Sequence, residues 1–122
     1  MSLSVRYLVH DVDKSVQFYQ QMLGFELVQQ FGPAMAILTK ESLTLWLAGP
    51  MSSAAQAMPN GQKPEPGGWN RFVLTVESLP QLVDTLKNQK VRFRNEIVKG
   101  PGGQQILCED PSGNLIELFQ PI

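Results

Sequence analysis

The sequence has only one cysteine, Cys108, and one histidine, His10, among its 122 residues. A single cysteine cannot form an intrachain disulfide, and one cysteine with one histidine cannot build a structural zinc site. We therefore expect a protein of the reducing cytoplasm. Cys108 is followed by Glu109 and Asp110. Their negative charges disfavour the thiolate form of a neighbouring cysteine, so a cysteine nucleophile is not expected.

An excess of one charge and long hydrophobic runs are also missing. Ten basic and eleven acidic residues give a net charge of -1, with no cluster of Lys or Arg, so we expect no nucleic-acid partner. The longest mainly apolar runs are far shorter than the ~20 residues that a membrane span needs. The start, "MSLSVRYLV", has no basic region before a long apolar core. We therefore expect neither a membrane partner nor a signal peptide.

What is present is the composition of a globular protein, with 43% hydrophobic and 17% charged residues. A chain of this length can bury roughly 65% of its unfolded surface, so we expect one domain, residues 1–122. A stretch rich in Pro, Gly, Ser and Ala divides it. The predicted parts are module one at about residues 1–48, a linker at about 49–68 and module two at about 69–122.

The first half begins with a β-rich run, Val5 to Val9, followed by "HDVDKSVQFYQQMLGF". This segment predicts a helix that Asp11 or Asp13 caps and Gly24 ends. Strand-like runs with turn signals between them come next: Phe25 to Phe31, Met35 to Thr39 and Leu43 to Leu47.

The second half repeats this order: "RFVLTV" predicts a strand, "SLPQLVDTLKNQ" a helix with Ser78 as candidate cap, and "QQILCE" and "LIELFQ" further strands around a "DPSGN" turn. "VRFRNEIV" shows some apolar and polar alternation. An offset of 67 residues matches Val9 with Val76 and Val16 with Val83. We predict an α+β protein of two β-α-β-β-β units. One α+β sandwich with a coincidental match is the alternative.

Two segments carry a family resemblance: "YLVHDVDKSVQFYQQMLGFEL" and "EDPSGNLIELFQ". They resemble the hallmark segments of the vicinal-oxygen-chelate superfamily, which includes glyoxalase I, bleomycin resistance proteins, fosfomycin-resistance enzymes and extradiol dioxygenases. The resemblance implies two βαβββ modules whose mixed sheets form a cup around a central site. It also implies a homodimer whose subunits jointly complete each cup. Whether modules pair within a chain or swap between chains stays open.

The resemblance also implies where a metal would bind. Metal-dependent members hold a divalent ion with two histidines, one on the first strand of each module, and a late glutamate. Glu117 matches the glutamate, but the histidine positions fall on Ser4 and Arg71. A serine hydroxyl is a poor ligand for these metals, and arginine stays protonated. We therefore expect no metal cofactor, with a divalent metal held through Glu117 as the alternative. His10, expected to be exposed or at the rim, is not assigned as a ligand.

Glu117 lies in an otherwise apolar strand. Leu115, Glu117 and Phe119 share one face, which the resemblance turns toward the cup. Since an unpaired buried charge costs several kcal/mol, we hypothesise that an Arg71–Glu117 ion pair replaces the metal. Arg6 can join it from the first strand. A Glu117 that simply faces solvent is the alternative.

Aromatic and apolar side chains are expected around this pair. Trp46 shares a strand face with Thr44 and Ala48, Trp69 lies at the exit of the linker, and Phe31 and Met35 flank a "GP" turn. Large flat side chains with few polar groups are typical of a small-molecule pocket. Core packing is the alternative for each aromatic taken alone, and it explains Trp46 equally well. Met51 and Met58 fit an adaptable lid or a disordered loop. The predicted ligand-binding residues are Ser4, Arg6, Trp46, Arg71, Glu117 and Phe119.

Three functions stay open. The first is a metal-free protein that captures a planar or aromatic small molecule, as the drug-sequestering antibiotic-resistance members do. The second is a divergent lyase or dioxygenase in which Glu117 is a metal ligand or general base. An arginine partner would weaken a glutamate as a base by favouring its ionised form. The third is a structural or partner-binding dimer without a ligand.

Overall fold

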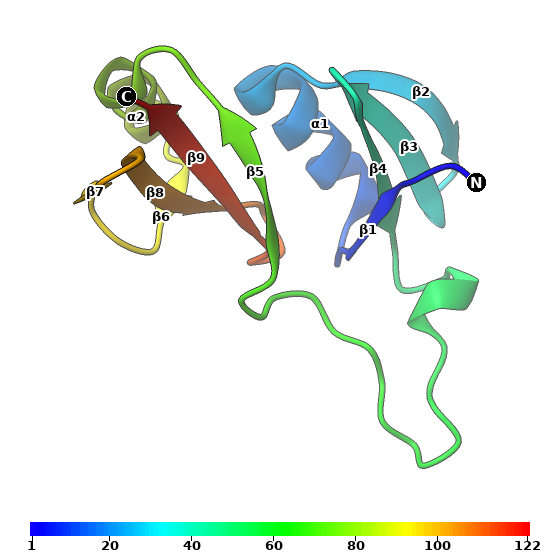
Figure 1. Cartoon of the computed structure of the whole chain (residues 1–122). Coiled ribbons are helices and arrows are strands. Elements are labelled where there is room, and N and C mark those ends of the chain that lie inside the picture. Colours follow the sequence, from blue (N-terminus) through cyan, green and yellow to red (C-terminus); the bar gives the residue numbers. More distant parts are fainter. The chain divides into compact units, whose positions relative to one another are not determined.

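A computed structural model describes all residues, 1–122, as two compact units, Met1–Gly67 (unit 1) and Gly68–Ile122 (unit 2). Figure 1 shows a sheet and a helix in each unit and the long segment that joins β4 to β5. Between those strands the only regular element is the short 3₁₀ helix η1, Ser53–Ala55. No helix in the structure is both long enough and apolar enough to cross a membrane.

Unit 1 is a four-stranded mixed sheet with one helix. The sheet order is β1-β4-β3-β2, in which β1 runs parallel to β4 and the other neighbours are antiparallel. The elements are β1 (Val5–Leu8), α1 (Val12–Leu23), β2 (Glu26–Phe31), β3 (Met35–Lys40) and β4 (Leu43–Ala48). The predicted helix and strands of the first half are confirmed, within a residue or two at their ends.

Helix α1 begins and ends where the sequence indicates. The Asp11 carboxylate accepts a hydrogen bond from the Lys14 backbone N–H at 3.0 Å, so Asp11 rather than Asp13 is the cap. Such a cap stabilises a helix by about 1 kcal/mol. Gly24 ends the helix with φ 73°, a left-handed conformation that favours glycine.

One face of the unit 1 sheet is buried and the other is not. Helix α1 packs on β3 and β4, where Leu38, Leu45 and Leu47 are fully buried. Because side chains alternate along a strand, Arg6 and Trp46 lie on the opposite face. We call this the open face of unit 1.

Unit 2 has the same order of elements. Its sheet is β5-β9-β8-β6, with β7 also paired to β8, and β5 runs parallel to β9. The elements are β5 (Arg71–Thr75), α2 (Leu79–Asn88), β6 (Arg92–Phe93), β7 (Val98–Gly100), β8 (Gly103–Glu109) and β9 (Leu115–Pro121). The predicted α+β fold with two β-α-β-β-β modules is therefore confirmed.

Two local features of unit 2 differ from simple sequence patterns. Ser78 is the N-cap residue of α2, but its side chain makes no capping bond. The N–H of Leu79, the first residue of the helix, donates to the Gln120 side chain at 2.7 Å. The alternating segment 91–98 gives two short strands rather than one. The Asn95 side-chain oxygen accepts the Leu107 N–H at 2.9 Å and takes the place of a backbone partner there.

The core of unit 2 lies between its sheet and α2. Ile106, Cys108, Ile116 and Leu118 are fully buried on the helix side. The opposite face, which we call the open face of unit 2, carries the residues that alternate with these. They include Arg71 and Val73 of β5, Leu115, Glu117 and Phe119 of β9, Leu107 and Glu109 of β8, and Arg92 of β6.

Candidate functional site

An arginine–glutamate pair lies on the open face of unit 2, across the edge strand β5 and its neighbour β9. Glu117 is on β9 and Arg71 is the first residue of the neighbouring strand β5. The Arg71 Nε and Nη2 atoms both donate to Glu117 Oε1, at 3.1 and 2.9 Å. Only 12% of the Glu117 side chain and 30% of the Arg71 side chain are exposed. The predicted Arg71–Glu117 ion pair is confirmed, and the alternative of a solvent-facing Glu117 is wrong.

These residues do not fit the metal centre that the family resemblance implies. Arg71 occupies a ligand position but cannot ligate, and two of its N–H groups bond to Glu117 Oε1. Ser4 is an exposed residue that precedes β1. The structure has no group of three or more His, Cys, Asp or Glu side chains that could hold a metal ion. The donor set is therefore one engaged carboxylate, which would bind divalent ions weakly.

A second charged cluster lies on the same face. Arg92 is in register with Glu109, and Arg94 follows two residues later. The Arg94 Nε lies 3.2 Å from Glu109 Oε2, and the Arg92 Nη2 lies 3.9 Å from Glu109 Oε1. Sequence reasoning missed this cluster. The signal was the alternation in "VRFR", which places both arginines on one face of a strand.

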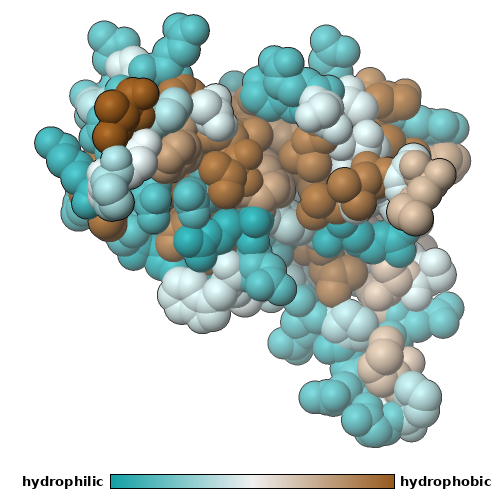
Figure 2. Space-filling view, in the orientation of Figure 1, coloured by the Kyte–Doolittle hydropathy of each residue, from teal (hydrophilic) through white to brown (hydrophobic).

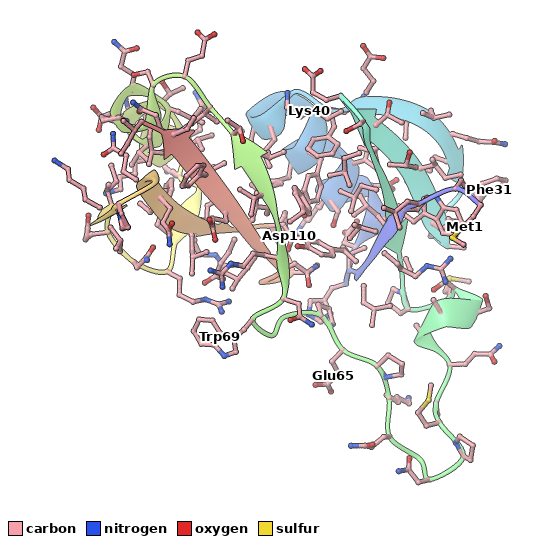
Figure 3. All side chains as sticks on the ribbon, in the orientation of Figure 1. Met1, Phe31, Lys40, Glu65, Trp69 and Asp110 are labelled. Atoms are coloured by element: carbon pink, nitrogen blue, oxygen red, sulfur yellow. The ribbon has the colours of Figure 1, made fainter.

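Arg94 holds the end of the linker in place. Its Nη1 donates to the Gly68 carbonyl and its Nη2 to the Gly113 carbonyl, both at 3.2 Å. Its guanidinium also lies 4.8 Å from the centre of the Trp69 ring. Figure 3 shows that ring where the linker meets β5. Trp69 is nevertheless 66% exposed, so it is an ordered aromatic surface.

The predicted site residues of unit 1 lie apart from any carboxylate partner. Arg6 forms no ion pair; its guanidinium lies 4.9 Å from the centre of the half-buried Trp46 ring. Its participation in the Arg71–Glu117 pair stays a prediction. Phe31, 47% exposed, and the half-buried Met35 are paired at one end of the β2–β3 ladder. Hydrophobic side chains reach the surface over the strands of this unit (Figure 2).

The remaining reactive side chains do not form a site. His10 is exposed between β1 and α1. Cys108 is fully buried, and burial raises the pKa of its thiol to about 12. Neutral and inaccessible, it has none of the properties of a nucleophile, in agreement with the sequence.

Phe119 is half-buried on the open face of unit 2, two residues beyond Glu117 on β9.

The family model for the glyoxalase/bleomycin resistance protein/dioxygenase superfamily matches residues 3–118. The chain belongs to this superfamily, the vicinal-oxygen-chelate class that its terminal segments resemble.

Solved structures with the same fold include proteins of several activities. A lactoylglutathione lyase from Agrobacterium tumefaciens has a TM-score of 0.75 and 17% identity, with 98% of this chain and 92% of that chain covered. The fosfomycin resistance protein FosX from Listeria monocytogenes has a TM-score of 0.75 and 16% identity, over 100% and 93%. TnmS3, an antibiotic binding protein from Streptomyces sp. CB03234, has a TM-score of 0.69 and 23% identity, over 100% and 98%. At these identities the likeness shows the fold alone.

Proposed function

We propose that this protein is a metal-free binding protein that captures a planar or aromatic small molecule without turnover. The observation that carries the proposal is the engagement of Glu117 by Arg71. Two guanidinium N–H groups already bond to this carboxylate, and an arginine cannot complete a metal centre. This arrangement supports binding and orientation of a ligand better than Lewis-acid or general-base chemistry.

Aromatic side chains in each unit support a ligand of this shape. Trp69 and Phe119 lie on unit 2, and Trp46 lies on the open face of unit 1. Aromatic side chains give large contact areas to planar groups and lose little conformational entropy on binding. Ser4, Arg6, Trp46, Arg71, Glu117 and Phe119 are the residues that we propose for ligand binding.

A role in drug sequestration is part of the proposal. Relatives of the same fold include one antibiotic binding protein and one fosfomycin resistance protein. For this chain we propose stoichiometric capture of a small molecule of that general kind. The homodimer implied by the family resemblance belongs to the same proposal, and light scattering at micromolar concentration tests it. A monomeric mass would contradict the dimer.

Elemental analysis of untagged protein tests the metal-free part. The protein is dialysed with manganese, iron, nickel and zinc and then into metal-free buffer. We expect no near-stoichiometric metal. Metal that is retained, and is lost in the Glu117→Gln variant, would overturn the proposal and favour the alternative, a lyase or dioxygenase with Glu117 as ligand.

A screen of neutral and charged aromatic molecules tests the binding part. We expect ligands that raise the unfolding temperature of the wild type, with a smaller effect on Arg71→Met. Consumption of a bound molecule by the wild type, abolished in Glu117→Gln, would instead indicate an enzyme with Glu117 as general base.

A further inference from the structure

The open face of unit 2 carries more positive than negative charge. Three guanidinium groups share it with two carboxylates; they are Arg71, Arg92 and Arg94 with Glu109 and Glu117. Glu117 is engaged by Arg71 at 2.9 Å, and Glu109 is shared between the other two arginines. One positive charge on this face is therefore not balanced by a carboxylate of its own.

The excess charge is best assigned to Arg92. The nearer contact of Glu109, at 3.2 Å, is to Arg94, while Arg92 lies at 3.9 Å, beyond hydrogen-bonding distance. The Arg92 side chain is 64% exposed, compared with 27% for Arg94. A guanidinium with N–H groups free for an incoming group suits a carboxylate, which it can bind through two parallel hydrogen bonds.

A flat surface adjoins this cluster. Arg94 lies over one face of the Trp69 ring at 4.8 Å and contacts Glu109, which in turn contacts Arg92. The Trp69 carbonyl also accepts a hydrogen bond from Arg71 Nη1 at 3.3 Å. Both the ring and the backbone of Trp69 are thus held before a ligand arrives. A preordered aromatic loses less entropy on binding than a mobile one.

We propose that the open face of unit 2 binds a planar aromatic acid. Its ring stacks on the exposed side of Trp69, and its carboxylate is bound by Arg92. Arg94 is a positioning residue that fixes Trp69 and takes the nearer contact of Glu109, which leaves the N–H groups of Arg92 without a hydrogen bond to that carboxylate. This inference rests on the proposed function and narrows its ligand from a planar molecule to a planar anion.

Three matched probes separate charge from planarity in titration calorimetry. They are naphthoate, its neutral amide naphthamide, and its saturated counterpart decahydronaphthoate. We expect naphthoate to bind about five-fold more tightly than naphthamide, as a partly exposed charge pair is worth ~1 kcal/mol. We expect a similar factor, about five-fold, over decahydronaphthoate, which cannot stack. The preference over the amide should shrink as salt is raised.

Variants assign each preference to a residue. Arg92→Gln should abolish the preference for the acid over the amide, and Arg92→Lys should keep part of it. Trp69→Ala should abolish the preference for the planar ring. Lys99→Gln is the matched control, because it removes one exposed positive charge from β7 of the same unit and leaves the network intact. It should leave both preferences unchanged.

Different results contradict the binding of an aromatic acid and the proposed capture of planar molecules in general. If naphthamide binds as tightly as naphthoate, the protein still binds planar molecules, but the inference that its ligand is an acid is wrong. If the preference for the acid survives Arg92→Gln, the anion lies elsewhere and the inference is overturned. If neither the probes nor any neutral aromatic molecule of the screen binds at millimolar concentration, the proposed function itself fails.

Discussion

In unit 1, Trp46 lies in the middle of β4 with the guanidinium of Arg6 over its ring; in unit 2, Glu117 lies in the middle of β9 and is bonded to Arg71. The two positions correspond. In unit 1 the first strand, β1, pairs with β4, and Trp46 comes one residue after the partner of Val5. In unit 2 the first strand, β5, pairs with β9, and Glu117 comes one residue after the partner of Phe72. Each unit therefore places an arginine against the side chain at this position of its open face. In unit 1 that side chain is a ring, and in unit 2 it is a carboxylate.

This difference separates what sets the fold from what sets the chemistry. On the helix side both sheets keep buried apolar residues, such as Leu38 and Leu45 in unit 1 and Ile106 and Ile116 in unit 2. The open faces carry no such constraint. A ring loses little on burial, but a carboxylate must recover the free energy of its lost hydration from a partner. The arginine of unit 2 is therefore more tightly constrained than that of unit 1.

The largest difference in the free energy of unfolding is expected when Arg71 of unit 2 and Arg6 of unit 1 are replaced separately. Arg71→Met leaves the Glu117 carboxylate, 12% exposed, without its partner, and should lower the free energy of unfolding by about 2 kcal/mol. Arg6→Met removes only a contact with a ring and should cost less than ~1 kcal/mol. Urea unfolding of both variants, followed by circular dichroism, measures the two values.

A double variant is the control for this prediction. Arg71→Met with Glu117→Leu replaces both partners by apolar groups of similar size, and should recover most of the loss because no charge stays unpaired. Equal losses for Arg6→Met and Arg71→Met would contradict the difference between the units.

A smaller difference in the free energy of unfolding is expected when the arginine that contacts a tryptophan in each unit is replaced by lysine. Arg94 also donates to Glu109, Gly68 and Gly113, whereas Arg6 forms no ion pair. Arg94→Lys keeps the charge but loses the planar group, and should cost about 1 kcal/mol; Arg6→Lys should cost a few tenths, roughly 0.3 kcal/mol.

Fluorescence shows whether Trp69 is released. In a Trp46→Phe background Trp69 is the only tryptophan, so selectively excited tryptophan emission comes from Trp69 alone. Arg94→Lys should then increase quenching by acrylamide and lower the anisotropy. If neither changes, Arg94 does not position the ring. Arg6→Lys in a Trp69→Phe background is the matched measurement for Trp46.

The helices and most strands could be predicted because their signals are local. The Asp11 cap, the helical spacing of apolar residues and Gly24 lie within a few residues of one another. The Arg71–Glu117 pair joins residues far apart in sequence. It could be predicted because the family resemblance placed both at one centre, and because a carboxylate in an apolar strand needs a partner.

What could not be predicted depends on contacts that no local pattern records. The Gln120 side chain accepts the Leu79 N–H at the start of α2, and Asn95 interrupts the strand pattern by accepting the Leu107 N–H. Arg94 reaches the Gly68 carbonyl, 26 residues away in sequence. A long side chain with five donors can satisfy distant carbonyls, and its partners follow from packing rather than from spacing.

The smallest expected change in the free energy of unfolding comes from a difference between the cores of the two units. In unit 2, Cys108 is paired with Ile116 across neighbouring strands, and in unit 1 Leu38 is paired with Leu45 in the same way. The core of unit 2 therefore has a thiol where the core of unit 1 has the alkyl side chain of Leu38. Burial raises the pKa of Cys108 from its ordinary value of 9.0 to about 12. The thiol of the unfolded chain ionises near its ordinary pKa while the folded one stays neutral. Its contribution to stability is therefore complete below that pKa and is lost as the pH rises above it.

Replacing the thiol isolates this contribution. Between about pH 8 and pH 9, the wild type should lose roughly 0.4 kcal/mol of unfolding free energy more than Cys108→Val, which has no group to ionise there. Urea unfolding of both proteins at each pH gives the difference, and titrations of other groups cancel because they are common to both. Identical losses in the two proteins would mean that the thiol ionises equally well in the folded chain. Rapid reaction of native Cys108 with a thiol reagent would lead to the same conclusion, since a buried neutral thiol reacts only when unit 2 opens.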